Sequence, residues 1–126
     1  MPYLLKTEPS AYSFDDLVRD GETVWDGIRN PQALNTLASM KKGDDLAIYH
    51  SVTDKQVVGR AKVVAVDASD PKNPRVTIKA HGRVRRPKTL AEMRDEPSFA
   101  GSLLFRQFRL SVVPLTDEQF AWLVQP

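Results

Sequence analysis

The chain has 126 residues, the usual length of one compact domain, and we expect residues 1–126 to form a single domain. It has no cysteine, which excludes a disulfide framework and a cysteine-based zinc site, and it has no apolar run long enough to span a membrane. The 18 basic and 16 acidic residues give a net charge of only +2, so a nucleic-acid partner would be held through few phosphates. Lys6 and Glu8 come too early for the apolar core of a signal peptide, so the expected location is the cytoplasm, including the nucleoid, or the nucleus of a eukaryote.

The first part of the chain predicts two strands around a short helix. The apolar run 2–7 predicts a mostly buried strand that ends before Pro9, since proline cannot extend a central strand. Ser13 is the expected N-cap of a helix that stops near Gly21, and the alternation over 22–25 predicts a strand. The residues at the end of the first strand therefore stand where loops usually carry function.

A second helix is predicted to begin at Asn30, with Pro31 at its first position, where a missing N–H costs nothing. Its apolar face reaches Met40, and Lys41-Lys42-Gly43 are expected to close it, because cations suit the negative end of a helix and glycine suits a left-handed stop. The start of this helix gathers unpaired N–H groups, which favours an anion near Asn30.

The middle of the chain predicts three strands, at 46–50, 57–66 and 75–80. Gly59, inside the second of them, predicts a bulge or the close approach of another group. The segment that follows the third strand, 81–88, is strongly basic.

Two further helices and one strand are expected towards the C-terminus. Thr89 opens a helix with a capping-box pattern, and Thr116 opens the closing helix in the same way. Between them we expect a short helix or irregular loop at 97–104 and a strand at 110–113. Several strands mixed with short helices predict an α+β fold built around a small barrel.

The stretch from Trp25 to Asn30 has the residue types that one wall of a nucleobase pocket requires. Trp25 offers a stacking face and an N–H donor, and Gly27 permits backbone angles, or a close approach, that other residues prevent. Arg29 offers a planar donor fork for phosphate, and Asn30 can donate and accept at one base edge. The alternative is that Trp25 is a core residue and Gly27 a turn.

Two polar groups, Lys6-Thr7-Glu8 and Tyr49-His50-Ser51, stand at strand ends that could face the same mouth of a barrel. A pocket with a stacking aromatic, hydroxyl or amide groups and a few cations suits a base taken out of its stack. A hydrolase is the competing interpretation, with Glu8 and His50 as acid and base and Ser51 as nucleophile, although no Gly-x-Ser-x-Gly turn supports it. His50 fits a hydrogen-bonded structural role equally well.

Basic residues cluster in two places. The denser cluster comprises His81, Arg83, Arg85, Arg86 and Lys88. Alternation would place Arg83 and Arg85 on one face, suited either to phosphate or to a solvated edge strand that charge protects from aggregation. The second cluster pairs Arg106 and Arg109 with two phenylalanines, which suits either a strand of nucleic acid or packing in the core.

Eight segments, in this order, carry a family resemblance: Leu4–Pro9, Tyr12–Leu17, Trp25–Ala33, Met40–Asp44, Tyr49–Ser51, Val58–Ala61, Arg86–Pro87 and Arg109–Val112. Together they resemble the EVE domain family, a branch of the PUA-like barrels related to the YTH domains. The resemblance implies an α+β fold, a PUA-like β-barrel of five or six strands with peripheral short helices. It also implies a pocket that holds a methylated base in an aromatic cage in YTH relatives, and a similar reading of modified bases in DNA by EVE domains.

The resemblance also implies roles for single residues. Lys6 and Thr7 match a Lys-Ser pair on the first strand of the pocket, and Trp25 matches a cage aromatic. The remaining matches are Asn30 with Gln32 just beyond the cage, Tyr49, His50 and Ser51 across the pocket, and Arg109 with Ser111 on the late strand. This chain departs from the family in having a lone Tyr3 near its start, Pro31 where tyrosine is frequent and a bulky Phe108, so a partial cage is expected.

We therefore predict a domain that binds a base, modified for example by methylation, within DNA or RNA and does no chemistry on it. Base contacts are expected from Lys6, Thr7, Glu8, Trp25, Gly27, Asn30, Tyr49, His50 and Ser51, and phosphate contacts from Arg29, Arg83, Arg85, Arg86, Arg106 and Arg109. No metal, cofactor or membrane partner is expected. The rival prediction is a small-molecule pocket, which would bind a free nucleoside or another metabolite with little dependence on salt.

Overall fold

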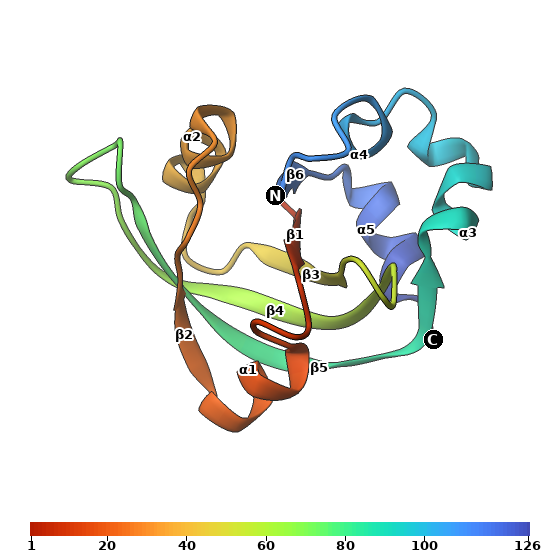
Figure 1. Ribbon diagram of the computed structural model, residues 1–126, viewed down its shortest axis with the longest axis horizontal. Helices are drawn as coiled ribbons and strands as arrows, with labels where there is room; N and C mark the ends of the chain where they lie inside the picture. The colour runs from red at the N-terminus through yellow and green to blue at the C-terminus, as the bar shows by residue number, and fades with distance from the viewer.

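The computed structural model describes residues 1–126, and every predicted strand and helix is present in it (Figure 1). In chain order the elements are β1 (Tyr3–Thr7), α1 (Phe14–Asp20), β2 (Glu22–Trp25), α2 (Pro31–Ser39), β3 (Asp45–His50), β4 (Gln56–Asp67), β5 (Arg75–Thr89), α3 (Leu90–Asp95), the 3₁₀-helix η1 (Pro97–Phe99), α4 (Leu103–Arg106), β6 (Val112–Pro114) and α5 (Asp117–Val124). No helix is both long enough and apolar enough to cross a membrane.

The six strands form one sheet in the order β2-β5-β4-β3-β1-β6. Neighbouring strands are antiparallel except β1 and β3, which are parallel. The long strands β4 and β5 curve, so that the sheet curls around β1, with α2 near one end and α3, α4 and α5 near the other (Figure 1). The curled sheet with its peripheral short helices confirms the predicted α+β, PUA-like fold.

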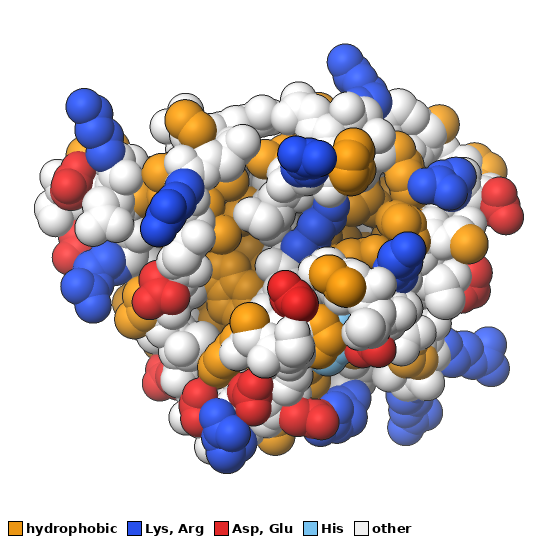
Figure 2. Space-filling model, viewed as in Figure 1, with side chains coloured by type: hydrophobic (Ala, Val, Ile, Leu, Met, Phe, Trp, Pro, Cys, Tyr) orange, Lys and Arg blue, Asp and Glu red, His pale blue; other side chains and the backbone are white.

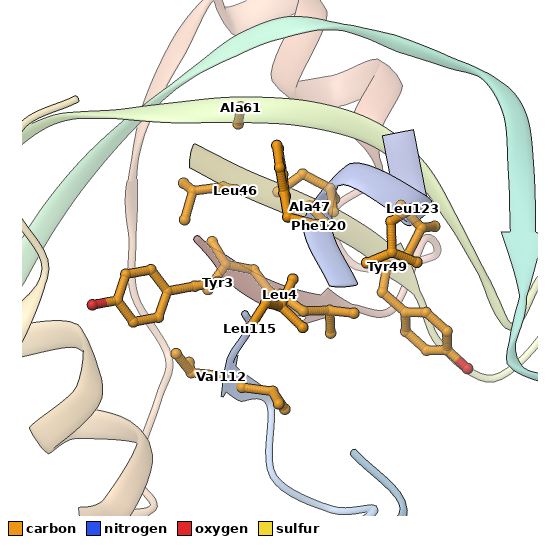
Figure 3. Packing of buried hydrophobic residues seen from close by; sticks show 14 of the residues in the cluster. Tyr3, Leu4, Leu46, Ala47, Tyr49, Ala61, Val112, Leu115, Phe120 and Leu123 are labelled. Atoms are coloured by element: carbon orange, nitrogen blue, oxygen red, sulfur yellow. The ribbon is translucent and has the colours of Figure 1, made fainter. Parts of the chain in front are cut away.

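The core lies inside the curl, where β1, β3 and β6 meet the closing helix α5. Leu4 and Leu46 from adjacent strands pack there against Leu115, Phe120 and Leu123 (Figure 3). Tyr49 stands at the edge of this cluster, with its hydroxyl directed away from it (Figure 3). Burial of these side chains is the main source of stability for a domain of this size.

The register of β1 against β3 decides which side chains share a face at the functional end of the sheet. Lys6 lies beside Tyr49, and Thr7 lies beside His50. Because successive side chains of a strand point to opposite faces, the first pair and the second pair are sent to opposite sides of the sheet.

Phe14 fixes α1 against the sheet. A Cβ built on Gly59 would lie 2.3 Å from the Phe14 ring, so only glycine leaves room for the ring at this point of β4. The Phe14 backbone N–H also donates to Nε2 of His50 at 2.9 Å. The prediction that Gly59 marks a close approach is confirmed.

Two sequence predictions about element ends were wrong. Strand β5 does not stop at Ala80 but runs to Thr89, because β4 is long enough to pair with the basic segment as well. Helix α2 ends at Ser39, and the residues expected to close it form a separate turn, in which Lys41 N–H donates to the Asp44 carboxylate at 2.8 Å. Gly43, with φ of +93°, belongs to this turn.

Candidate functional site

A cavity of about 300 Å³, which we call the aromatic pocket, opens between β1, β2 and the loop that precedes α1. Tyr12 and Trp25 form its aromatic walls, with ring centroids 6.2 Å apart and planes at 80°. Its lining residues are Thr7, Ala11, Tyr12, Thr23, Val24, Trp25 and Asp26. At this distance and angle the two rings are in edge-to-face contact with each other, so a flat ligand would lie against the pair and not between the rings.

Local structure explains why these rings meet. Trp25 is the last residue of β2 and is held on the sheet by its pairing with Val76 of β5. The segment before α1 turns back on itself, since the Ala11 and Tyr12 N–H groups both donate to the Glu8 carbonyl at 2.9 Å. Thr7 Oγ1 donates to the Tyr12 carbonyl at 2.6 Å, which ties this turn to the end of β1.

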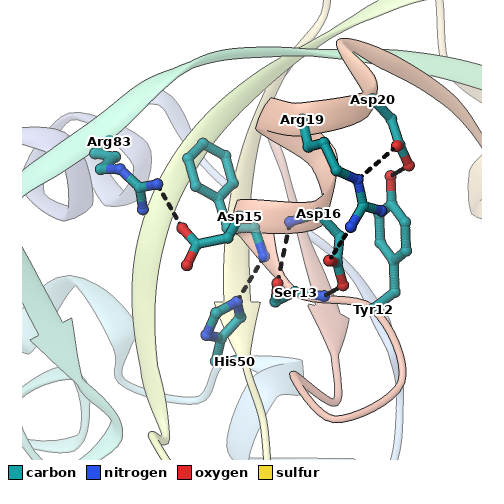
Figure 4. A network of polar contacts seen from close by, with 9 residues as sticks. Tyr12, Ser13, Asp15, Asp16, Arg19, Asp20, His50 and Arg83 are labelled. Carbon is teal, nitrogen blue, oxygen red and sulfur yellow. Dashed lines mark hydrogen bonds and ion pairs between the residues drawn. The ribbon is translucent and has the colours of Figure 1, made fainter.

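The Tyr12 ring is fixed at its far end by a polar network on α1 (Figure 4). Its hydroxyl donates to Asp20 at 2.8 Å, and Arg19 bridges Asp20 and Asp16, at 3.1 Å from each. Burial of the ring and the hydrogen bond to Asp20 both raise the pKa of Tyr12 above its ordinary value. Tyr12 therefore presents a neutral, oriented ring to the pocket at physiological pH.

A second hollow, of about 230 Å³, adjoins the aromatic pocket and shares Val24, Trp25 and Asp26 with it. We call it the outer pocket; its other walls include Gly27 and the exposed Arg75. Gly27 has a φ of +79°, so this bend after Trp25 uses the conformational freedom that the sequence indicated.

A third cavity, of about 360 Å³, lies on the other side of β1, and we call it the cationic pocket. Its lining includes Lys6, Tyr49 and Ser51. Lys6 Nζ donates to the Phe108 carbonyl at 2.7 Å and lies 5.9 Å from the centre of the Tyr49 ring. The face drawn in Figure 2 is hollowed on both sides of its middle, and apolar side chains form the floor of the larger hollow.

The predicted base-contacting residues thus do not form one pocket. Thr7 and Trp25 line the aromatic pocket, whereas Lys6, Tyr49 and Ser51 line the cationic pocket. The cause is strand alternation, which sends Lys6 and Thr7 to opposite sides of β1 although they are neighbours in sequence.

Three other predicted residues have structural partners. His50 is buried, with Nε2 accepting from Phe14 N–H and Nδ1 2.8 Å from the Asp54 carboxylate, so both ring nitrogens are occupied inside the protein. Asn30 caps α2, its side-chain oxygen accepting from Ala33 N–H at 3.0 Å. Glu8 is exposed and accepts from Ser10 at 2.8 Å.

The arginines predicted to bind phosphate are all exposed but scattered over the surface. Arg29 lies in the segment between Trp25 and α2. Arg83 pairs with Asp15 of α1, and it stands seven residues beyond the β5 position that faces Trp25, roughly 20 Å along the strand. Arg85 and Arg86 lie further still along β5. Arg106 ends α4, and Arg109 lies over the Phe108 ring at 5.7 Å.

Sequence reasoning missed Tyr12 and Thr23 as pocket residues, and it placed Asp26 in the pocket wall without giving it a contact. Thr23 was recoverable, because it stands two residues before Trp25 on a strand and so shares its face. Tyr12 stands just before the Ser13 cap, and only the backbone turn at Glu8 brings it to β2. No group of three or more His, Cys, Asp or Glu side chains is placed to hold a metal ion.

The sequence matches the EVE domain family over residues 2–125. It is 31% identical to thymocyte nuclear protein 1 of Gallus gallus over 94% of this chain. The matched region covers 65% of the length of that protein. The crystal structure of protein Atu2648 from Agrobacterium tumefaciens superposes with a TM-score of 0.91 and 31% identity, over 98% of this chain and 90% of the other. The human THYN1 protein in complex with DNA containing 5-methylcytosine gives a TM-score of 0.83 and 27% identity, over 98% and 95% of the two chains.

Proposed function

Since this chain belongs to the EVE domain family, we propose that it binds a modified base, of the 5-methylcytosine type, within DNA by holding it in the aromatic pocket. The single observation that carries this proposal is the edge-to-face aromatic pair Tyr12 and Trp25 in the lining of a cavity of about 300 Å³. The human relative crystallised with 5-methylcytosine DNA supports the choice of ligand.

The chemistry of the walls fits such a base. Each aromatic face that stacks on a base contributes roughly 1–3 kcal/mol, and a methyl group adds apolar area for the ring edge to cover. Asp26 lines both the aromatic and the outer pocket, and a carboxylate can accept a hydrogen bond from the amino group of cytosine. Thr7 and Thr23 supply further polar atoms at the pocket wall.

The pocket acts as a binding site without chemistry. A hydrolase would need Glu8, His50 and Ser51 around one ligand. However, both ring nitrogens of His50 contact protein groups, the Phe14 N–H and the Asp54 carboxylate. Ser51 lines the cavity on the other side of β1. The phosphates on either side of the base would meet Arg29 and Arg75, both exposed near Trp25. The weak net charge implies a shallow dependence of affinity on salt.

The experiment compares Trp25→Ala with Trp122→Ala, a control at the only other tryptophan of the chain, which packs on Phe99. Fluorescence anisotropy measures the binding of labelled oligonucleotides that differ only in cytosine or 5-methylcytosine at one position, at two salt concentrations. Wild type should prefer the modified base, and Trp25→Ala should bind it about 5- to 150-fold more weakly, which corresponds to the loss of one stacking partner.

Circular dichroism establishes that both variants fold, and Trp25→Leu replaces Trp25→Ala if the latter does not. Trp122→Ala should keep the preference for the modified base. Equal binding by wild type and a folded Trp25 variant would refute the proposal. Tight binding of a free nucleoside, insensitive to salt, would instead favour a small-molecule pocket.

A further inference from the structure

We propose that the cationic pocket is a second binding site, which holds a nucleotide next to the base in the aromatic pocket by its phosphate and its ring. This inference rests on the proposed function, because it assigns the neighbouring nucleotide of the same strand. The two pockets meet at β1, since Lys6 lines the cationic pocket and Thr7 lines the aromatic pocket.

The charge of the cationic pocket is complementary to a phosphate. Lys6 is half-buried, Lys55 and Arg94 are exposed, and none of the ten lining residues is acidic. Burial lowers the pKa of Lys6, which means that its charge is held in a partly dehydrated place where an anion would stabilise it. In this chain of nearly balanced charge, three cations without an acid in one cavity point to an anionic ligand.

The rest of the lining suits a flat, apolar body attached to that anion. Tyr49, Phe105 and Phe108 contribute three aromatic rings, and Phe108 is 70% exposed, so its ring is accessible to a ligand. Arg94 lies 5.3 Å from the centre of the Phe105 ring, so a cation and a stacking surface are already side by side. A nucleotide combines these two requirements, an anion and a ring, in one ligand.

The wall formed by residues 51–55 is built with a strained backbone. Val52 has a φ of +70° and Lys55 a φ of +49°, in the left-handed region that β-branched and long side chains rarely adopt. The Lys55 carbonyl accepts from Leu90 N–H at 2.8 Å, which holds this turn against the start of α3, the helix that also carries Arg94. The turn therefore keeps Lys55 beside α3 at a cost in local conformational energy.

The test uses a single-stranded oligonucleotide with one 5-methylcytosine and two versions of it in which the neighbour on either side is abasic. One abasic version should bind wild type at least fivefold more weakly, the loss expected for one stacked base. Lys55→Ala and Arg94→Ala should weaken binding of the intact oligonucleotide and lower its salt dependence by about one released counterion each. Lys42→Ala, a control at an exposed lysine of the 41–44 turn, should change neither.

The outcomes separate this inference from the proposed function. Suppose that wild type binds the intact oligonucleotide, that both abasic versions bind as tightly, and that Lys55→Ala and Arg94→Ala bind like wild type. The cationic pocket is then not a nucleotide site, and the proposal for the aromatic pocket is unaffected. If no oligonucleotide binds, the proposed function fails, and a 5′-mononucleotide tested on wild type and Arg94→Ala decides the cationic pocket alone. If wild type binds the mononucleotide and Arg94→Ala does not, the cationic pocket is a site for a free nucleotide. If wild type does not bind the mononucleotide, the inference of a nucleotide site is overturned.

Discussion

The aromatic pocket and the cationic pocket use the same strand end in opposite ways. On one side of β1, Thr7 faces Tyr12 and Trp25, and the only charged lining residue is Asp26. On the other side, Lys6 shares a cavity with Lys55 and Arg94 and with no acid. The lining of the first pocket suits a flat ring with hydrogen-bonding edges, and the lining of the second suits an anion.

This division follows from the geometry of a strand. Side chains of neighbouring residues leave β1 in opposite directions, so the dipeptide Lys6-Thr7 supplies one residue to each pocket. A cation beside the base would add affinity for any nucleic acid without favouring one base, because phosphate contacts carry no sequence information. If both proposals hold, the cations across the strand would keep base selectivity and general attraction in separate cavities.

The largest effect is expected from Gly59→Ala, which should affect the two pockets unequally. The new Cβ would overlap the Phe14 ring at 2.3 Å, so α1 must move away from β4. We expect a loss of about 1–3 kcal/mol in the free energy of unfolding, the usual cost of overpacking, measured by urea denaturation. Because Tyr12 is joined to α1 through Asp20, the displacement should damage the aromatic pocket and spare the cationic pocket.

Binding measurements on the same variant complete that prediction. The preference for 5-methylcytosine over cytosine should fall, whereas the effect of an abasic neighbour should persist. Equal losses at both pockets would mean that they respond as one unit. Ala61→Gly, at the next inward position of β4, serves as a control that perturbs the same strand without a clash.

Local sequence patterns predicted the elements of the fold but not the division of the site into two pockets. Caps, strands and the α+β barrel were recoverable because each depends on local patterns, such as Ser13 before Asp15 and Asp16 or the alternation at the start of β5. The division of the site was not, because it depends on the register of β1 against β3, a contact between segments about 40 residues apart. A structural role for His50 was one of the two expectations, but its partner Phe14 lies 36 residues away, and no local pattern indicates that contact.

A smaller effect is expected from two N-cap variants, one at the helix beside each pocket. Ser13→Ala removes the side chain that accepts from Asp16 N–H at the start of α1, and Thr89→Ala removes the one that accepts from Glu92 N–H at the start of α3. Each should cost about 1 kcal/mol of stability. Amide hydrogen exchange should show faster opening of α1 in the first variant and of α3, which carries Arg94, in the second.

The two cap variants should affect different parts of DNA binding. Ser13→Ala should reduce selectivity for the modified base, and Thr89→Ala should reduce the contribution of the neighbouring nucleotide. If both variants altered the same binding step, the assignment of one helix to each pocket would be wrong.

The smallest effect is expected from Lys6→Met, and its sign is informative. The folded protein lowers the pKa of Lys6 below the ordinary 10.5, so burial of its charge opposes folding at neutral pH. Between the lowered value and 10.5 the unfolded chain binds more protons, so the stability of wild type relative to Lys6→Met should rise as the pH increases through this window. At pH 7, urea denaturation should show Lys6→Met equal to wild type or more stable by up to about 1 kcal/mol, with weaker binding of DNA. A variant less stable than wild type at pH 7 would mean that Lys6 serves to hold the Phe108 carbonyl, and the cationic pocket would then lose the residue that most directly marks it as a place for an anion.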